Sequence, residues 1–272
     1  MVEQNAKTER EPRTVQTLRQ TGRNVLQVCR NAGAAMLMLG SAAAYIPTIV
    51  TPRARRETVM QMYVAGIKSL GVITIVAFFT GMILALQTGL ELRRYGQETN
   101  IGTLVMVVMI REMGPFMTGL IIAASVGSSI AAQLGTMAVS EEISALEVMS
   151  INPNRFLVMP RLVALTVMMP VLTVYTNLVG IIGGGVVGVT QIGVAFHAYL
   201  DNAIQFAANK DLYVGLFKAM VFGVIVATVS CYQGMTTTEG AVGVGRATRA
   251  SVVISFLLIL IVGYMITRLF YI

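Results

Sequence analysis

Two charged residues stand next to each other inside a long apolar stretch. Arg111 and Glu112 interrupt the otherwise uncharged run 99–140. If this stretch crosses a membrane, charges within it are costly and mark a functional site or an internal ion pair. The alternative is an interfacial pair at the start of a helix, because residues 113–140 are long enough to span by themselves. The sequence alone leaves both interpretations open.

A second constellation follows this run. Ser140 is a good helix N-cap, and Glu141 and Glu142 would lie at the positive end of the helix dipole. Three apolar residues share one face of the predicted helix: Ile143, Leu146 and Met149. Pro153 is expected to stop it. A short amphipathic helix of this kind fits a groove on a partner protein, whereas the alternative is a passive connecting loop.

Catalytic signatures are absent from the printed sequence. There is no GxxxxGK[ST] phosphate loop, and the single histidine, His197, excludes HExxH and most zinc sites. We therefore expect no catalytic residue, no metal and no cofactor in this chain. Nucleic acid is not an expected partner, because the basic residues flank apolar segments and lack an aromatic platform. If this chain takes part in a process that consumes energy, another chain must supply that energy.

The elements that carry these residues are predicted to be membrane helices. The chain has 272 residues, of which 55% are hydrophobic and 12% charged, about half the charge of an ordinary soluble domain. A helix needs about 20 apolar residues to cross the hydrocarbon core. Five charge-free runs are that long or nearly so: 69–90, 113–140, 162–200, 219–238 and 250–267. The sequence predicts an all-α integral membrane protein with five transmembrane helices.

The N-terminal region has a different character. Nine of the 20 Lys and Arg residues precede residue 57, which places the N-terminus in the cytoplasm and the C-terminus outside. Residues 1–12 are expected to be a solvated tail, and the basic, apolar mixture after them suits an interfacial amphipathic helix. Segment 31–52 could span or lie at the interface, and we favour the interface. We therefore divide the chain into two regions. Residues 1–56 are expected to form the tail and the interfacial helix, and residues 57–272 the transmembrane domain.

Topology follows by alternation from a cytoplasmic N-terminus. The spans are expected near 64–90, from 101 to about 138, at 162–188, over 219–238, and from 250 to the C-terminus. Loop 91–100 is then outside, and the segments 138–160 and 239–249 are inside. Five glycines of the third span form a small-residue face, which we interpret as internal bundle packing rather than a dimer seam: Gly180, Gly183, Gly184, Gly185 and Gly188.

At these residues the sequence resembles the MlaE/YrbE family of ABC transporter permeases, over roughly residues 55–270. The stretches that carry the resemblance are Gln61-Met-Tyr63 with Gly66, Phe79 to Gln87, Arg111-Glu-Met-Gly-Pro115, Gly135 to Arg161, and Glu239 to Thr248. The sequence departs from the family pattern at Ser125 and Gln133, where relatives commonly carry Arg and Glu. We expect these two positions to lie near one helix face and to have lost an ion pair together, whereas the alternative is that each site changed independently.

The resemblance implies a function and a set of partners. The family forms homodimeric permeases that carry phospholipids between the inner and outer membranes of bacteria. A cytoplasmic ABC ATPase binds ATP and Mg, and a periplasmic MCE-domain lipid-binding protein sits above the permease. By this resemblance the coupling helix is about Ser140 to Ser150, with ATPase-coupling residues Glu141, Glu142, Ala145, Leu146 and Met149. The expected lipid path comprises Phe79, Met82, Leu86, Arg111 and Glu112. For the first three, which form one apolar stripe, plain helix packing is the alternative.

Two functions from other classes compete with this expectation. A stand-alone secondary transporter or channel would use ionisable residues at mid-membrane, for which Arg111 and Glu112 qualify. A membrane scaffold that anchors a partner complex would need no transport path. Co-purification with an ATPase would distinguish an ABC permease from a secondary transporter or channel. ATP-dependent lipid transfer would distinguish an ABC permease from a scaffold.

Overall fold

The computed structural model describes residues 13–205 and 209–271, and its folded elements are helices. Within this part of the chain, five helical segments are long and apolar enough to cross a membrane, which confirms an all-α membrane protein. They are Pro52–Arg94, Glu98–Val139, Asn154–Ile192, Asn209–Met235 and Gly240–Tyr271.

Several of these segments are interrupted by 3-10 or π-helical turns. The first contains α2 (Pro52–Gly66), η2 (Ile67–Ser69) and α3 (Leu70–Arg94). The second contains η3 (Glu98–Asn100), α4 (Ile101–Val108), η4 (Met109–Met113), α5 (Gly114–Ile122), η5 (Ala123–Gly127) and α6 (Ser128–Val139). The third contains η6 (Asn154–Val158), α8 (Met159–Val187) and η7 (Gly188–Ile192), and the last two are α10 (Asn209–Met235) and α11 (Gly240–Tyr271). Outside them lie α1 (Arg13–Ala44), η1 (Ile46–Val50), α7 (Glu142–Val148) and α9 (Phe196–Gln205).

The helices extend well beyond the charge-free runs. α10 begins at Asn209, although the uncharged run begins at residue 219. The segment 239–249 is not the expected loop, because α11 begins at Gly240 and only a short turn precedes it. Its cytoplasmic location stays a prediction. Hydropathy locates the part of a helix that can lie in hydrocarbon. It does not locate the helix end, because a charged residue continues a helix when it is paired or lies outside the hydrocarbon.

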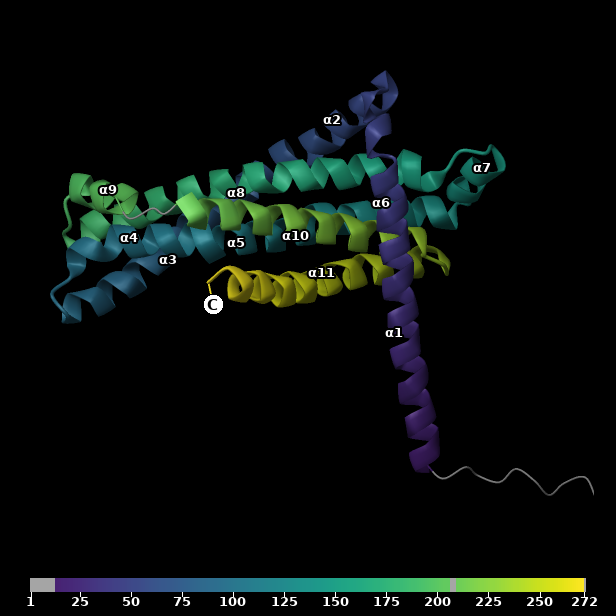
Figure 1. Ribbon diagram of the computed structural model, residues 1–272, viewed down its shortest axis with the longest axis horizontal. Coiled ribbons are helices and arrows are strands. Elements are labelled where there is room, and N and C mark those ends of the chain that lie inside the picture. The colour runs from purple at the N-terminus through teal and green to yellow at the C-terminus, as the bar shows by residue number, and fades with distance from the viewer. Residues whose placement is uncertain (1–12, 206–208, 272) are drawn as a thin grey trace, which may run out of the picture.

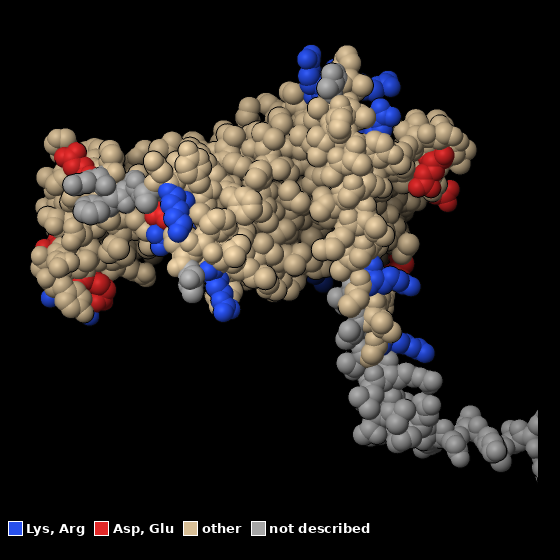
Figure 2. Space-filling view, in the orientation of Figure 1, with Lys and Arg blue, Asp and Glu red and all other residues tan. Residues whose placement is uncertain are grey.

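The bundle has two distinct ends (Figure 1). α7 and the turn between α10 and α11 lie at one end, and α9 lies at the other with the turn between α3 and α4. Figure 2 shows an uncharged band across the middle of the visible face, with charged side chains toward both ends. This arrangement suits a membrane protein whose spans alternate in direction.

α1 runs crosswise to the bundle near the α7 end (Figure 1). Its last turns dock on the bundle through buried Met38 and Ala42, and Asn154 Nδ2 donates to Ser41 Oγ at 2.8 Å. α1 is not among the five candidate spans found in the described residues. Its direction suits a helix on the membrane surface. The proposed tail, 1–12, lies outside the described residues.

Glycine allows the central helices to approach closely. α8 packs between α3 and α10, and a Cβ at Gly81 of α3 would lie 1.8 Å from the Gly180 carbonyl oxygen. Gly183 faces the Phe78 carbonyl oxygen in the same way, at 2.4 Å from a built Cβ. Small residues let backbones meet where lipid supplies no hydrophobic driving force.

The rest of the glycine face receives a tyrosine from α9. Tyr199 is fully buried against Gly184, Gly185 and Gly188, and its hydroxyl donates to the Ile181 carbonyl at 3.0 Å. Burial raises the pKa of Tyr199, so the hydroxyl keeps the proton that it donates. The whole predicted face is thus used within the chain, which confirms internal packing.

We predict that Gly81→Ala separates α3 from α8 and lowers the free energy of unfolding by about 1–3 kcal/mol. The matched control is Gly71→Ala on the same helix, where a Cβ meets nothing within 4 Å. Thermal unfolding of the two purified variants in mild detergent measures the difference. Equal stabilities would show that the α3–α8 contact tolerates a methyl group.

We also predict the orientation of the bundle, in a background with Cys29→Ser and Cys231→Ala. Gln97 and Ser150 are exposed at opposite ends of the second span. Gln97→Cys should react with an impermeant maleimide in spheroplasts with an intact inner membrane. Ser150→Cys should react only after that membrane is permeabilised. The reverse pattern would invert the topology.

Candidate functional site

Arg111 and Glu112 lie in η4, a π-helical turn inside the second span. The helical segment continues from η3 through α6, so the interpretation of a charge pair at a helix start is wrong. π-turns inside helices are frequent at functional sites. Pro115 follows, and it has no N–H to donate to the Arg111 carbonyl four residues earlier. Lys218 Nζ of α10 donates to that carbonyl instead, at 3.0 Å.

Lys218 is the most deeply buried charge of the site. Its side chain is 1% exposed, and Nζ makes an ion pair of 2.7 Å with Glu112 Oε1. A third hydrogen bond, of 2.7 Å, runs from Nζ to Thr267 Oγ1 of α11. The ammonium group has three hydrogens, and all three are used. Lys218 therefore joins the second, fourth and fifth spans at one point.

Arg111 makes a separate ion pair with α10. Its Nη2 donates to Asp211 Oδ1 at 2.9 Å and to Oδ2 at 3.0 Å, and its Nε lies 3.2 Å from Oδ1. The Tyr271 hydroxyl donates to the same carboxylate, and the Arg111 guanidinium lies 4.0 Å from the centre of the Tyr271 ring. The C-terminal end of α11 is thereby fixed to the other two helices.

The two adjacent charges thus pair with α10 and not with each other. Sequence reasoning missed both partners, because it began the fourth span at residue 219, after Asp211 and Lys218. The signal was present in their spacing. Positions seven residues apart share one helix face, so Asp211 and Lys218 can meet two neighbouring charges on a facing helix.

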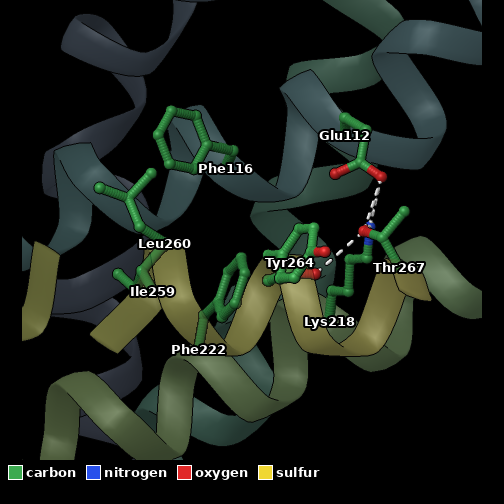
Figure 3. A pocket seen from close by; sticks show the side chains of 9 residues that line it. Glu112, Phe116, Lys218, Phe222, Ile259, Leu260, Tyr264 and Thr267 are labelled. Atoms are coloured by element: carbon green, nitrogen blue, oxygen red, sulfur yellow. Dashed lines mark hydrogen bonds and ion pairs between the residues drawn. The ribbon is translucent and has the colours of Figure 1, made fainter. Parts of the chain in front are cut away.

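A cavity of about 300 Å³ opens beside this cluster. One end is polar and is formed by Glu112, Lys218 and Thr267 (Figure 3). The other end is apolar and includes Phe116, Phe222 and Ile259. The walls come from η4, α5, α10 and α11, so the cavity lies among three spans of one chain. Such a space can hold a molecule with one polar and one apolar end.

The predicted lipid-path residues of the first span lie elsewhere. Phe79 is 55% exposed on the outer side of α3, whereas Met82 and Leu86 pack against the core near α4 and α9. The structure therefore does not bring these three side chains together with Arg111 and Glu112. Their role in a lipid path stays a prediction.

The predicted coupling residues lie on and beside α7 at one end of the bundle (Figure 1). Ile143 is buried and Leu146 packs partly against the core, whereas Met149 is 61% exposed. The expected common face is therefore divided between the bundle and the outside. The outward residues of the predicted set are Glu141, Glu142, Ala145 and Met149.

The expected ends of this helix need correction. Ser140 is not the N-cap of α7, because its N–H bonds to Thr136 O at 2.9 Å and it is the C-cap of α6. Glu141 holds the N-cap position with φ of 60°, a left-handed conformation that turns the chain from α6 into α7. α7 ends at Val148, before Pro153 can act. Ser150 has φ of 59°, and backbone hydrogen bonds from Ser150 N to Glu147 O and from Ile151 N to Leu146 O close the turn after α7.

The two positions that depart from the family pattern make separate contacts. Ser125 Oγ bonds to Ile121 O of its own helix, at 2.7 Å. The Gln133 side-chain oxygen lies 3.4 Å from Nη2 of buried Arg161. Gln133 therefore meets a charge on α8 rather than Ser125. Arg161 also donates to Leu157 O at 2.8 Å, while its Nε has no hydrogen-bond partner among the described residues.

Comparison with known proteins gives a consistent result. The sequence model of the family described as Permease MlaE matches residues 58–269. A probable ABC transporter permease protein of Rickettsia prowazekii is 38% identical over 250 residues, covering 92% of this chain and 96% of that protein. The intermembrane phospholipid transport system permease protein MlaE of Haemophilus influenzae is 33% identical over 256 residues, covering 92% and 95%. A probable ABC transporter permease protein of Synechocystis is 38% identical over 217 residues, covering 80% and 82%.

We predict that Lys218→Leu is strongly destabilising, because it leaves the Glu112 carboxylate without a counter-charge. Breaking one partner of a buried pair costs about 3–5 kcal/mol. The double variant Lys218→Leu with Glu112→Gln should recover part of this loss. Thermal unfolding of both singles and the double measures the coupling.

The control for this cycle is Arg94→Leu with Glu91→Gln. That pair is exposed, and exposed pairs contribute about 0–1 kcal/mol. Additive effects at Lys218 and Glu112 would contradict the proposed dependence of one charge on the other.

Proposed function

The chain belongs to the MlaE family of ABC transporter permeases, and we propose that it carries phospholipids between the inner and outer membranes of a bacterium. The cavity beside Glu112 and Lys218 is the observation that carries this proposal. It is polar at one end and apolar at the other, as a phospholipid is. The residues around it sit within spans, where ionisable side chains mark substrate pathways.

The size of the cavity limits what it holds at one time. A space of about 300 Å³ accommodates a head group and the adjoining part of a chain rather than a whole two-chain lipid. The remaining hydrocarbon would lie along neighbouring apolar surface. We propose that Phe79, Met82 and Leu86 of α3 form another part of this path, in agreement with the exposure of Phe79.

Energy is proposed to come from a separate cytoplasmic ATPase that binds ATP and Mg. This chain has no phosphate loop in its sequence, which fits a transport subunit. α7 is the proposed contact, because it stands at one end of the bundle and presents Glu142 and Met149 outward. Its inner residue, Ile143, packs into the core, so a force on α7 can reach the spans.

The assembly proposed around the chain has two further members. A second copy of this chain would form a homodimer, and an MCE-domain protein would receive lipid on the periplasmic side. The N-terminus and α7 are proposed to lie in the cytoplasm, with α9 and the C-terminus on the periplasmic side of the inner membrane. The broad apolar surface of α11, including Leu257 and Ile261, is available for the first of these contacts.

One observation favours a second candidate, an ion-coupled secondary transporter. The ion pairs Glu112–Lys218 and Arg111–Asp211 lie within the spans, where coupled protons or ions could bind. Transport driven by an ion gradient without an ATPase would select this candidate. Transport that requires ATP and the ATPase would select the ABC permease.

We predict that Glu142→Lys lowers lipid-stimulated ATP hydrolysis several-fold in proteoliposomes that contain the permease and its co-purified ATPase. The substitution reverses the charge of an exposed residue in the first turn of α7. ATP-dependent transfer of a fluorescent phospholipid is measured in the same vesicles. Membrane insertion, measured by carbonate extraction, should not change.

The control variant is Glu91→Lys, which changes an exposed glutamate near the far end of α3. It should leave ATP hydrolysis by the permease–ATPase complex at the wild-type rate. Wild-type stimulation in Glu142→Lys would remove α7 as the coupling element. A failure of wild-type protein to transfer lipid with ATP would contradict the proposed function itself.

A further inference from the structure

The polar end of the cavity has an unusual balance of hydrogen-bond donors and acceptors. Lys218 is the cation that faces it, but Nζ already donates to Arg111 O, Glu112 Oε1 and Thr267 Oγ1. An ammonium group has three hydrogens and no acceptor. Lys218 therefore has no donor left for a phosphate oxygen.

Arg111 does not supply the missing donor, because it does not line the cavity. It donates through Nε and Nη2 to Asp211, and its guanidinium lies over the Tyr271 ring. The η4 side chain that lines the cavity is Glu112. Lys218 and Arg111 are thus both neutralised by carboxylates of this chain.

Glu112 has the opposite property. The hydrogen bonds to its carboxylate in the described part of the chain all go to Oε1, from Lys218 at 2.7 Å and Thr267 at 2.9 Å. Figure 3 shows the other oxygen pointing away from Lys218, toward the side of Tyr264 and Phe116. The side chain is 37% exposed and lines the cavity. A carboxylate oxygen can accept two hydrogen bonds, and it gains most from a donor in an apolar surrounding.

The other walls favour a cationic group, methylated or not, so the discrimination between head groups rests on Glu112 Oε2. Phe116, Phe222 and Tyr264 place three aromatic rings around the cavity. Aromatic faces attract ammonium groups and repel anions. Because Lys218 already neutralises Glu112, a bound ammonium needs its own negative charge, which the phosphate of a zwitterionic lipid supplies.

We propose that this cavity selects lipid head groups that donate hydrogen bonds, with Glu112 Oε2 as the acceptor. The proposal rests on the proposed lipid transport. A terminal ammonium, as in ethanolamine lipids, and the hydroxyls of glycerol lipids share the required chemistry. A trimethylated ammonium has no N–H to donate, so choline lipids are bound poorly even though they carry the same charge.

The test is a competition between lipids that differ only in methylation. The full-length permease in complex with its ATPase is purified in mild detergent. It is offered phosphatidylethanolamine, its N-methyl and N,N-dimethyl forms, and phosphatidylcholine with identical chains. Native mass spectrometry reads the bound lipids. Affinity should remain high while an N–H is present and fall roughly tenfold at the trimethyl form, because a hydrogen bond to a charged group is lost.

A phosphatidylglycerol arm separates the two sources of the donor. Binding of phosphatidylglycerol more tightly than phosphatidylcholine assigns the site to donors in general. Binding of phosphatidylethanolamine alone above phosphatidylcholine assigns it to ammonium groups. Both results support a hydrogen-bond acceptor at the head-group site, and Glu112→Gln tests whether that acceptor is Glu112.

Variants place the selectivity in this cavity. Glu112→Gln can present an amide N–H₂ in place of the free oxygen, so the preference for ethanolamine over choline should fall toward unity. Glu91→Gln, in an exposed ion pair, should retain it. Leu260→Trp, which fills the cavity from α11, should lose the selective lipid while retaining unselective ones. If Glu112→Gln does not fold, the methylation series and Leu260→Trp decide the matter.

Equal binding of choline and ethanolamine lipids to the wild type would overturn this inference, as would selectivity that survives both cavity variants. If ATP-driven transfer continues without selectivity, the inference fails and the proposed function stands. If no lipid is bound or transferred, both fail.

Discussion

A charge inside a membrane bundle must be neutralised by the protein, because the lipid offers neither water nor ions. Lys218 is where this constraint acts most strongly, since its side chain is 1% exposed. Its three acceptors come from η4 and α11, so one side chain of α10 fixes the relative positions of three spans. The Arg111 carbonyl is available to it because Pro115 removes the donor that would otherwise compete. Pro115 thus leaves the Arg111 carbonyl free to accept a hydrogen bond from a residue far along the chain.

Close helix packing makes these ion pairs short. Asp211, Gly215 and Lys218 follow one another at four and three residues, on one face of α10. A Cβ at Gly215 would lie 2.3 Å from the Ile110 carbonyl oxygen, so only glycine permits this approach of α10 to η4. The carboxylate before it and the ammonium after it then reach the two charges of η4. The same use of small residues joins α3 to α8, where Gly81 meets Gly180.

The second span connects the two ends of the proposed transport cycle. It carries η4 beside the cavity and then continues through α5, η5 and α6 to the turn that leads into α7. A movement of α7 by an ATPase would therefore be passed along one helical segment to Glu112. Two π-turns, η4 and η5, lie within this segment, and such turns are frequent at functional sites. Coupling and lipid binding would then share a mechanical path.

The sequence by itself determined the properties that depend on local composition. Hydropathy gave five spans and an all-α membrane protein, because burial in lipid requires long apolar helices whatever their neighbours are. Glycine spacing on α8 correctly indicated internal packing. Only the tertiary structure decided which charges meet. Arg111 and Glu112 are sequence neighbours, but their side chains leave η4 toward Asp211 and Lys218, about 100 residues away. Pairing across that distance depends on helix register and approach, which no local pattern specifies.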